Sequence, residues 1–182
     1  MRQSSQVAPW LAALGLLGAT SGAADTTVAD HAPATVVERA YELINLARGK
    51  SRHCGADLFP AVPPLATSGQ LTRAALVHAQ DMARLHYFEH QGQDGSTPRD
   101  RLARQGYASQ LTGENIAYGP ESAEEVVAGW LASPGHCANI MDARFRETGL
   151  AFAVDSRHAT YWVQALALPG GPRRPAATPR RR

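Results

Sequence analysis

Residues 148–168, TGLAFAVDSRHATYWVQALAL, contain two stretches of alternating side chains, one on each side of the polar segment SRHA. In the first stretch Leu150, Phe152 and Val154 fall on one side, and in the second Trp162 and Leu166 do the same. A period of two, interrupted by a short polar turn, is typical of an antiparallel β-hairpin. We therefore predict that the domain ends in a hairpin.

Two helical patterns come early in the chain. Apolar residues recur at helical spacing over residues 35–48, and Gly49 ends this pattern. A second helix is predicted to begin near Ser68, with Thr67 and Gln70 at capping-box spacing. Its residues on one face are Leu71, Ala74, Ala75, His78 and Met82. Both helices are therefore expected to bury one side.

The middle of the chain predicts a loop and two more helices. Residues 54–65 contain three prolines and are expected to form an irregular loop. A third, short helix is predicted from Thr97 to Gly106, and a fourth from the capping residue Ser122 to a stop before Pro134. Helices first and a hairpin last predict an α+β domain, in which helices cover an antiparallel sheet.

The two ends of the chain differ from the domain between them. Residues 1–24 predict a secretory signal peptide, because an apolar run at 10–19 precedes small residues, with cleavage after Ala23 or Ala24. This run is shorter than the roughly 20 residues that a transmembrane helix needs, so we expect no permanent anchor and a secreted or periplasmic protein. Residues 169–182 are rich in proline, glycine and arginine and predict a disordered basic tail.

Composition narrows the function classes. The chain has 182 residues, of which 44% are hydrophobic and 19% charged, so one globular domain is expected, as a monomer. Its net charge of +2 depends on five arginines in the tail. Without them the domain is mildly acidic, and this argues against nucleic acid as a partner.

Two cysteines, Cys54 and Cys137, are present. Export to an oxidising compartment favours a disulfide between them. Such a bond would close a loop of roughly 80 residues and contribute about 4 kcal/mol, mainly by restricting the unfolded chain. The alternative is two buried free thiols.

Two catalytic schemes find little support in the residues. The segment HYFEH, His86 to His90, matches the H-x-x-E-H pattern of reversed zinc peptidases, which requires a helix through both histidines. The helical pattern ends near Leu85, before this segment. For acyl transfer, the chain has no G-x-S-x-G motif, and its cysteines are better explained as a bridge.

A third scheme uses residues that lie far apart in the sequence. His90, Glu114 and His136 each lie beside or close to a glycine or proline, and two imidazoles with one carboxylate could converge on a divalent ion. Spacing does not show convergence, and structural hydrogen bonding is the alternative that the pattern alone favours. His78 lies on an apolar stripe and is expected to be a buried, hydrogen-bonded histidine.

Five segments resemble one known family. HYFEHQGQDGSTPRDRL, GENIAYG, GWLASPGHCANIM, ETGLAFAV and YWVQALA occur in the order and approximate spacing seen in the CAP superfamily, which includes cysteine-rich secretory proteins, insect antigens and plant pathogenesis-related proteins. The chain looks most like the secreted bacterial branch, and the likeness covers residues 35–168. It implies a three-layer α-β-α sandwich with a central antiparallel sheet.

The resemblance also implies a cleft lined by two histidines and two acidic residues, which in some members binds zinc or another divalent ion. Carried over by position, the histidines are His90 and His136, and one acid is Glu114. Eukaryotic members have W-x-x-E where this chain has Trp130 followed by Ser133 in the fourth place, so the second acid is missing. A cleft of His90, Glu114, Ser133 and His136 is then expected, with a modest metal site completed by water.

Further expectations concern structure and activity. Cys54 and Cys137 resemble a bridge of bacterial relatives, Asn115 is expected to hold neighbouring backbone, and Trp130 to pack in the core. The ligand implied by the family is small, with lipid or sterol among the candidates. We expect binding without turnover; the alternative is a metal-dependent hydrolase, with Glu114 as general base on zinc-bound water.

Overall fold

The structure is a computed structural model and describes residues 35–171, so the predicted signal peptide and residues 172–182 of the predicted tail lie outside the described residues. Helices and strands follow in this order: α1 Val36–Arg48, β1 Arg52–Cys54, β2 Asp57–Phe59, β3 Ala66–Thr67, α2 Gly69–Leu85, α3 Pro98–Arg104, β4 Ser109–Tyr118, α4 Ala123–Ala132, α5 Pro134–Met141, β5 Glu147–Val154 and β6 Thr160–Pro169. The predicted α+β class is confirmed.

The main sheet has four strands in the order β3-β5-β6-β4. The predicted hairpin is β5 and β6, which pair antiparallel, and β6 also pairs antiparallel with β4. The two-residue strand β3 pairs parallel with β5, so the expected antiparallel sheet carries one short parallel edge strand. Strand β4 forms the opposite edge.

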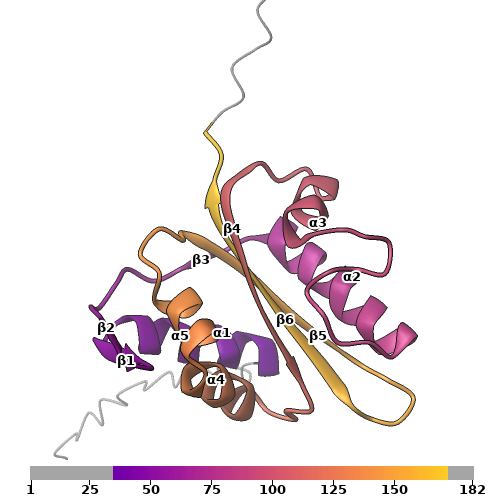
Figure 1. Ribbon diagram of the computed structural model, residues 1–182, viewed down its shortest axis with the longest axis horizontal. Helices are drawn as coiled ribbons and strands as arrows, with labels where there is room; N and C mark the ends of the chain where they lie inside the picture. Colours follow the sequence, from indigo (N-terminus) through magenta and orange to yellow (C-terminus); the bar gives the residue numbers. More distant parts are fainter. Residues whose placement is uncertain (1–34, 172–182) are drawn as a thin grey trace, which may run out of the picture. The chain divides into compact units, whose positions relative to one another are not determined.

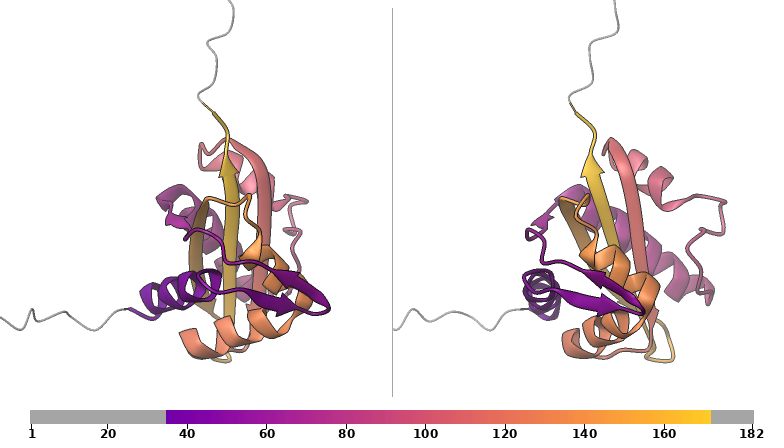
Figure 2. Two further views of the ribbon diagram at one scale, coloured as in Figure 1. Left: turned by 90° about the vertical axis from the view of Figure 1, so that its left-hand side faces the viewer. Right: turned by 60° about the vertical axis from the view of Figure 1, so that its left-hand side comes forward.

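Helices cover both faces of this sheet, as Figures 1 and 2 show: α2 and α3 lie on one face, and α1, α4 and α5 on the other. Alternate residues of β6 enter two separate hydrophobic clusters. Trp162 and Leu166 belong to the cluster with α1, α4 and α5, whereas Val163 and Ala165 belong to the cluster with α2. The three-layer sandwich is thus built by a strand that is buried on both faces.

The layer containing α2 packs directly on β5. A Cβ atom at Gly149 of β5 would lie 2.1 Å from backbone atoms of Leu71 and Thr72 in α2. Only glycine permits so close an approach of helix to strand. Gly149 therefore fixes the depth at which α2 rests on the sheet.

The helix ends agree with the sequence at some positions and differ at others. Thr35 caps α1 and Thr97 caps α3, both in full capping boxes. The capping box predicted for Thr67 and Gln70 is wrong, because Thr67 pairs with β5 as part of β3. Ser68 is the N-cap of α2 and makes no side-chain cap bond.

Several elements were not expected from the sequence. The loop predicted over residues 54–65 contains β2 and begins at the end of β1, and these two strands form a separate antiparallel hairpin. Strand β4 and helix α5 were also missed. Pro134 does end α4 as predicted, but it also occupies the first position of α5, where a proline ring fits because that amide has no helical partner.

Two features hold α5 in place. Cys54 and Cys137 form the expected disulfide, with Cα atoms 5.4 Å apart, and the described residues contain no free cysteine. Arg48 of α1 is fully buried and donates to backbone carbonyls at the C-terminal end of α5 and in the neighbouring loops, namely those of Pro63, Ile140, Asp142 and Phe145. None of the helices in the described range is long and apolar enough to cross a membrane.

Candidate functional site

The site is built around the edge strand β4, whose neighbouring residues face different layers. Glu114 pairs in register with Ala165, and Asn115 with Gln164. Glu114 consequently points toward α2 and α3, while Asn115 points toward α5. Polar side chains on both faces of an edge strand can join the two helical layers at that edge.

The segment HYFEH does not form the helix that a reversed zinc peptidase needs. Helix α2 ends at Leu85, and His86 has a left-handed backbone conformation with φ of 55°. The H-x-x-E-H scheme is therefore wrong for this chain. His86 lies instead 3.4 Å from Asp155 through its Nδ1 atom, away from the site.

Glu114 and His90 are in direct contact. Glu114 is buried, and its Oε1 atom lies 2.9 Å from Nδ1 of His90. An ionised carboxylate only accepts hydrogen bonds, so Nδ1 of His90 carries the proton and a neutral His90 has its lone pair on Nε2. The His90 side chain is 53% exposed. Glu114 thus orients an imidazole whose free nitrogen is available to a ligand.

Arg101 of α3 holds the other oxygen of Glu114. Its side chain is only 5% exposed, and its Nη2 atom donates to Oε2 of Glu114 over 2.7 Å. The same guanidinium donates to the backbone carbonyls of His90 and Ser96. Sequence reasoning missed Arg101, although a buried carboxylate implies a cation nearby.

His78 of α2 completes the buried side of this cluster. It is buried as expected, and its Nε2 atom lies 2.9 Å from the carbonyl oxygen of Glu89 and 3.9 Å from Oε1 of Glu114. Burial lowers the pKa of His78, against the opposing effect of the Glu114 charge. The ring is therefore a neutral donor behind Glu114.

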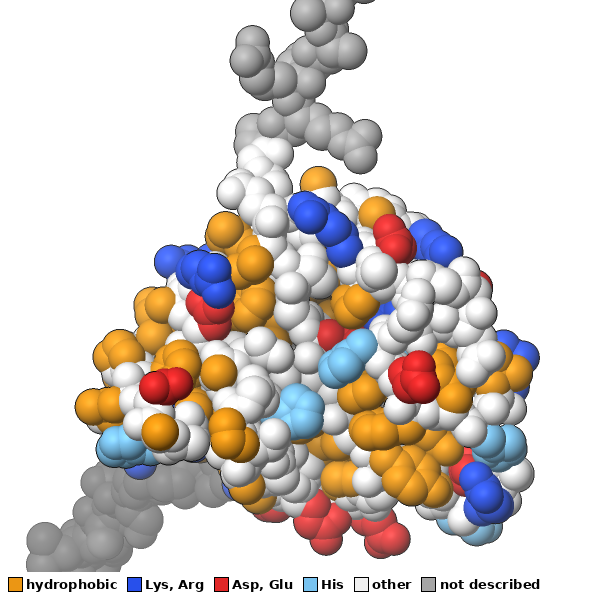
Figure 3. All heavy atoms as spheres, in the orientation of Figure 1, with side chains coloured by type: hydrophobic (Ala, Val, Ile, Leu, Met, Phe, Trp, Pro, Cys, Tyr) orange, Lys and Arg blue, Asp and Glu red, His pale blue; other side chains and the backbone are white. Residues whose placement is uncertain are grey.

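His136 reaches the site from the other layer. It lies in the first turn of α5, and its pKa is lowered by burial and then by the charge of His90. Figure 3 shows histidine side chains beside a carboxylate in the middle of one face. The structure thus joins His90 with Glu114, and the bond from Asn115 to the backbone carbonyl of His136 sets the first turn of α5 against β4.

Asn115 connects the strands to α5. It is fully buried, and its Nδ2 atom donates to the carbonyl of His136 and to Oε1 of Gln164, while its Oδ1 atom accepts from Asn139. Asn139 also donates to the carbonyl of Glu114. Every one of these polar groups is satisfied within the core, so the network fixes the distance of His136 from β4.

The remaining site residues have structural positions. Trp130 is buried and donates through Nε1 to the carbonyl of Ile116 over 3.1 Å. Ser133 is the N-cap of α5 but makes no side-chain cap bond. Gly113, which opens the segment GENIAYG, leaves room for the ring of Phe145, because a Cβ there would lie 2.6 Å from that ring. The segment is hence packed closely on both sides of Glu114.

The donor set limits which metal site the residues can form. A catalytic zinc site has three protein ligands. Both oxygens of Glu114 are already bonded, and no group of three or more His, Cys, Asp or Glu residues within 35–171 is arranged to hold a metal ion. The residues therefore do not fit a three-ligand zinc site with Glu114 as ligand. Two imidazoles remain as candidate donors.

Comparison with known proteins agrees with this architecture. The model of the Cysteine-rich secretory protein family, CAP, matches residues 41–166. YkwD of Bacillus subtilis (strain 168), described as uncharacterized, is 32% identical over 139 residues, which are 76% of this chain and 49% of YkwD. The chain thus spans about half the length of that relative.

Two solved structures share the fold. An extracellular protein containing an SCP domain from Bacillus anthracis str. Ames has a TM-score of 0.60 and 30% identity, covering 72% of this chain and 40% of that one. An outer surface protein from Borrelia burgdorferi has a TM-score of 0.58 and 22% identity, covering 71% and 90%. Because the family model matches residues 41–166 and solved structures share the sandwich, the chain belongs to the CAP family of cysteine-rich secretory proteins.

Proposed function

We propose that this chain is an exported binding protein whose ligand is held by the imidazoles of His90 and His136, without turnover. The observation that carries the proposal is the 2.9 Å contact of His90 Nδ1 with the buried Glu114. A histidine that donates one ring nitrogen to a carboxylate presents the other as a well-oriented, more basic ligand. Glu114 acts as the support of this ligand.

The chemistry of the two donors suggests what they bind. Imidazole nitrogens suit divalent transition metals such as Zn²⁺, and two of them with water make a weak site. Lowering of the pKa of His136 by burial keeps this second imidazole unprotonated near neutral pH. A cation between the two side chains would therefore meet an unprotonated nitrogen on His136.

An aromatic surface lies on the loop and strand that carry the site. Phe88 and Tyr118 are 45% and 51% exposed, with ring centroids 6.1 Å apart, and Tyr118 packs edge-on against Tyr161 at 4.9 Å. Figure 3 shows hydrophobic side chains gathered next to the histidines. Phe88 is two residues from His90, and Tyr118 is on the same strand as Glu114. We infer that an organic ligand would place an apolar group here and a polar group on the imidazoles.

The hydrolase alternative has less support. A general base must have a free position from which to take a proton from water. Oε1 of Glu114 contacts His90 and Oε2 accepts from Arg101, and the whole side chain is buried. Protonation of Glu114 would weaken both contacts, so this residue is better suited to hold an imidazole than to activate water.

A hollow away from the histidine site supports the expectation that the protein binds a lipid. Between α1 and α4 lies a hollow of about 310 Å³, whose apolar lining includes Leu43, Leu46, Val127 and Leu131. Lys50, Arg52 and Glu124 are also on its wall, and the Glu124 carboxylate is paired with Arg39, so the two other charges are an excess of cations. Apolar walls next to cations suit a single-chain anionic lipid. We propose this groove as the place for such a lipid, separate from the histidine site.

Zinc titration by calorimetry tests the main proposal. The wild-type mature protein is compared with His90→Ala, His136→Ala and the control His158→Asn, which removes an exposed histidine from a hairpin turn and retains a residue that tolerates its φ of 66°. We expect saturable uptake that is lost in both site variants and kept in the control. Uptake that neither site variant changes would show that the cleft proposal is wrong.

The same four proteins are assayed against a panel of peptide and ester substrates. Zinc uptake without hydrolysis supports a binding protein. Hydrolysis that disappears in both His90→Ala and His136→Ala would favour the enzyme instead. For the groove, displacement of a fluorescent fatty acid should be weakened by Leu46→Asp, which changes an exposed lining residue, and unaffected by His136→Ala. Equal binding by the Leu46 variant would refute the lipid site.

A further inference from the structure

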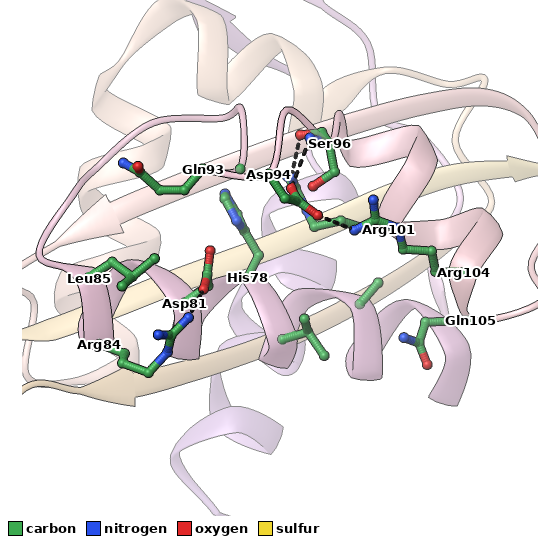
Figure 4. A pocket seen from close by; sticks show the side chains of 13 residues that line it. His78, Asp81, Arg84, Leu85, Gln93, Asp94, Ser96, Arg101, Arg104 and Gln105 are labelled. Atoms are coloured by element: carbon green, nitrogen blue, oxygen red, sulfur yellow. Dashed lines mark hydrogen bonds and ion pairs between the residues drawn. The ribbon is translucent and has the colours of Figure 1, made fainter.

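A cavity separate from the histidine face lies between α2, α3 and the turn formed by residues 92–96. Its volume is about 400 Å³, within the range of sites that hold small molecules. Figure 4 shows side chains from all three segments arranged around it. This cavity goes beyond the proposed function, because neither His90 nor His136 lines it.

One wall of the cavity is apolar. Ala74, Val77 and Leu85 lie on the side of α2 that borders it. Val77 and Leu85 are 51% and 41% exposed, which leaves two large apolar side chains open to a ligand. A ligand with an apolar group of similar size would gain by covering them.

Two ion pairs stand at the rim. In α2, Nη2 of Arg84 lies 2.6 Å from Oδ1 of Asp81. Between α3 and the turn, Nη1 of Arg104 lies 2.5 Å from Oδ2 of Asp94. Figure 4 shows the two pairs on either side of the His78 ring. Hydrogen bonds from Ser96 and the contact with Arg104 hold the pKa of Asp94 well below its usual range, so it stays anionic. The rim thus carries one carboxylate and one guanidinium at each of the two ion pairs.

A third residue contacts the carboxylate of Asp81. Tyr87 donates its hydroxyl proton to Oδ2 of Asp81 over 2.9 Å. Burial, together with this bond, raises the pKa of Tyr87 to about 12, so the hydroxyl remains a donor at neutral pH. The second oxygen of Asp81 accepts from Arg84. Each carboxylate oxygen has a further lone pair for a ligand's ammonium group.

The back wall contributes no net charge. Arg101 lines the cavity, but its charge is balanced by Glu114, and His78 is kept neutral by burial. The remaining charges are those of Arg84 and Arg104 against Asp81 and Asp94. Their sum is zero, and this selects against a ligand with a net charge while leaving partners for one that carries both signs.

From this balance we propose that the cavity binds a small zwitterion with an apolar side chain, of the class of a free α-amino acid or a dipeptide. Its ammonium group lies at Asp81 and its carboxylate at Arg104, whose guanidinium has further donors besides the one that Asp94 accepts. Its side chain covers Val77 and Leu85. Leucine serves as the probe for a free α-amino acid, and leucyl-leucine as the probe for a dipeptide.

Changing the probe tests the proposal without any change to the protein. In ¹⁵N–¹H NMR titrations of the mature protein, leucine or leucyl-leucine should shift the amides of residues 74–85 and 92–105 saturably. Leucinamide lacks the carboxylate, and N-acetylleucine lacks the ammonium group. Each should bind about tenfold more weakly or worse, because a charge-assisted bond is lost. Equal binding of these analogues, or no saturable shift with either zwitterion, would overturn the proposal.

Variants locate the site and separate it from the histidine face. Asp81→Asn and Arg104→Gln should each weaken zwitterion binding about tenfold, whereas the control Arg73→Gln, which also removes an exposed arginine near the same helix face, should not. His136→Ala should leave zwitterion binding unchanged and abolish only zinc uptake. Unchanged affinity in both Asp81→Asn and Arg104→Gln would place the ligand elsewhere and refute the proposal.

Discussion

Replacing Arg101 by methionine would remove the cation that faces the buried carboxylate of Glu114. The two side chains are 5% and 4% exposed, and the N–O distance is 2.7 Å. Methionine keeps most of the volume, so the chief effect is electrostatic. Breaking a buried pair by removal of one partner typically costs about 3–5 kcal/mol, because the remaining charge is left without compensation. Three hydrogen bonds, to Glu114, His90 and Ser96, are lost as well.

Urea unfolding at pH 7 measures this cost as the change in unfolding free energy. Arg104→Met is the matched control, since this arginine is on the same helix and its pair with Asp94 is largely exposed. Exposed pairs contribute little. The control should therefore lose far less stability than Arg101→Met, while both variants keep the circular dichroism of the folded protein.

A double-mutant cycle with Glu114→Gln separates the ion pair from packing. Glutamine retains an oxygen for the Nδ1 proton of His90 and removes the charge. The double variant should be more stable than the sum of the two single changes predicts, by about 1–3 kcal/mol. If Arg101→Met cost no more than Arg104→Met, or if the two single effects simply added, the buried-pair reasoning would be refuted.

Three other changes test the architecture. The pKa of His78 is lowered by burial in the folded protein, so as the pH falls the imidazole is protonated first in the unfolded chain, and the unfolding free energy decreases as the pH drops through the pKa of the unfolded state. His78→Gln should therefore reduce the stability that urea unfolding shows to be lost between pH 7 and pH 5. If the variant lost as much stability as the wild type, His78 would be excluded as the cause. Replacing both Cys54 and Cys137 by serine should cost about 4 kcal/mol, and mass spectrometry of the unreduced protein should find no free thiol. Gly149→Ala should cost at least about 3 kcal/mol in thermal or urea unfolding, whereas Gly129→Ala, in open space on α4, should gain about 0.5–1 kcal/mol; equal effects would contradict the close packing of α2 on β5.

The hairpin of β5 and β6 and most helices could be predicted because their signals are local. The alternation in residues 148–168 and the capping residues Thr35 and Thr97 act within a few positions of the chain. Pro134 shows where this reasoning stops. It both ends α4 and begins α5, and only the packing of α5 through Cys137 and Asn115 decides that the chain turns into a second helix.

Arg101 shows the same limit for the candidate site. The buried side of α3 includes Arg101 and Leu102, with Pro98 and Gln105 half-buried one turn away on each side. This is helical spacing, but an arginine in a short, highly charged helix is ordinarily taken to face water. The inward position of Arg101 can be predicted only when the buried Glu114 is known to need a cation. The contact between the two side chains joins α3 to β4, so no local pattern in α3 indicates it.

The missed strand and the site have a common cause. In β4 the consecutive residues Glu114, Asn115 and Ile116 are all buried, so the alternation that would mark a half-exposed strand is absent. The first two are polar because they hold His90 and α5, and the fold compensates for burying them with Arg101 and Gln164. A core selected for stability alone would place apolar side chains here. The break in the hydrophobic pattern at GENIAYG therefore marks where the chain gives up a simple core to hold the imidazole of His90 on one face of the strand and α5 on the other.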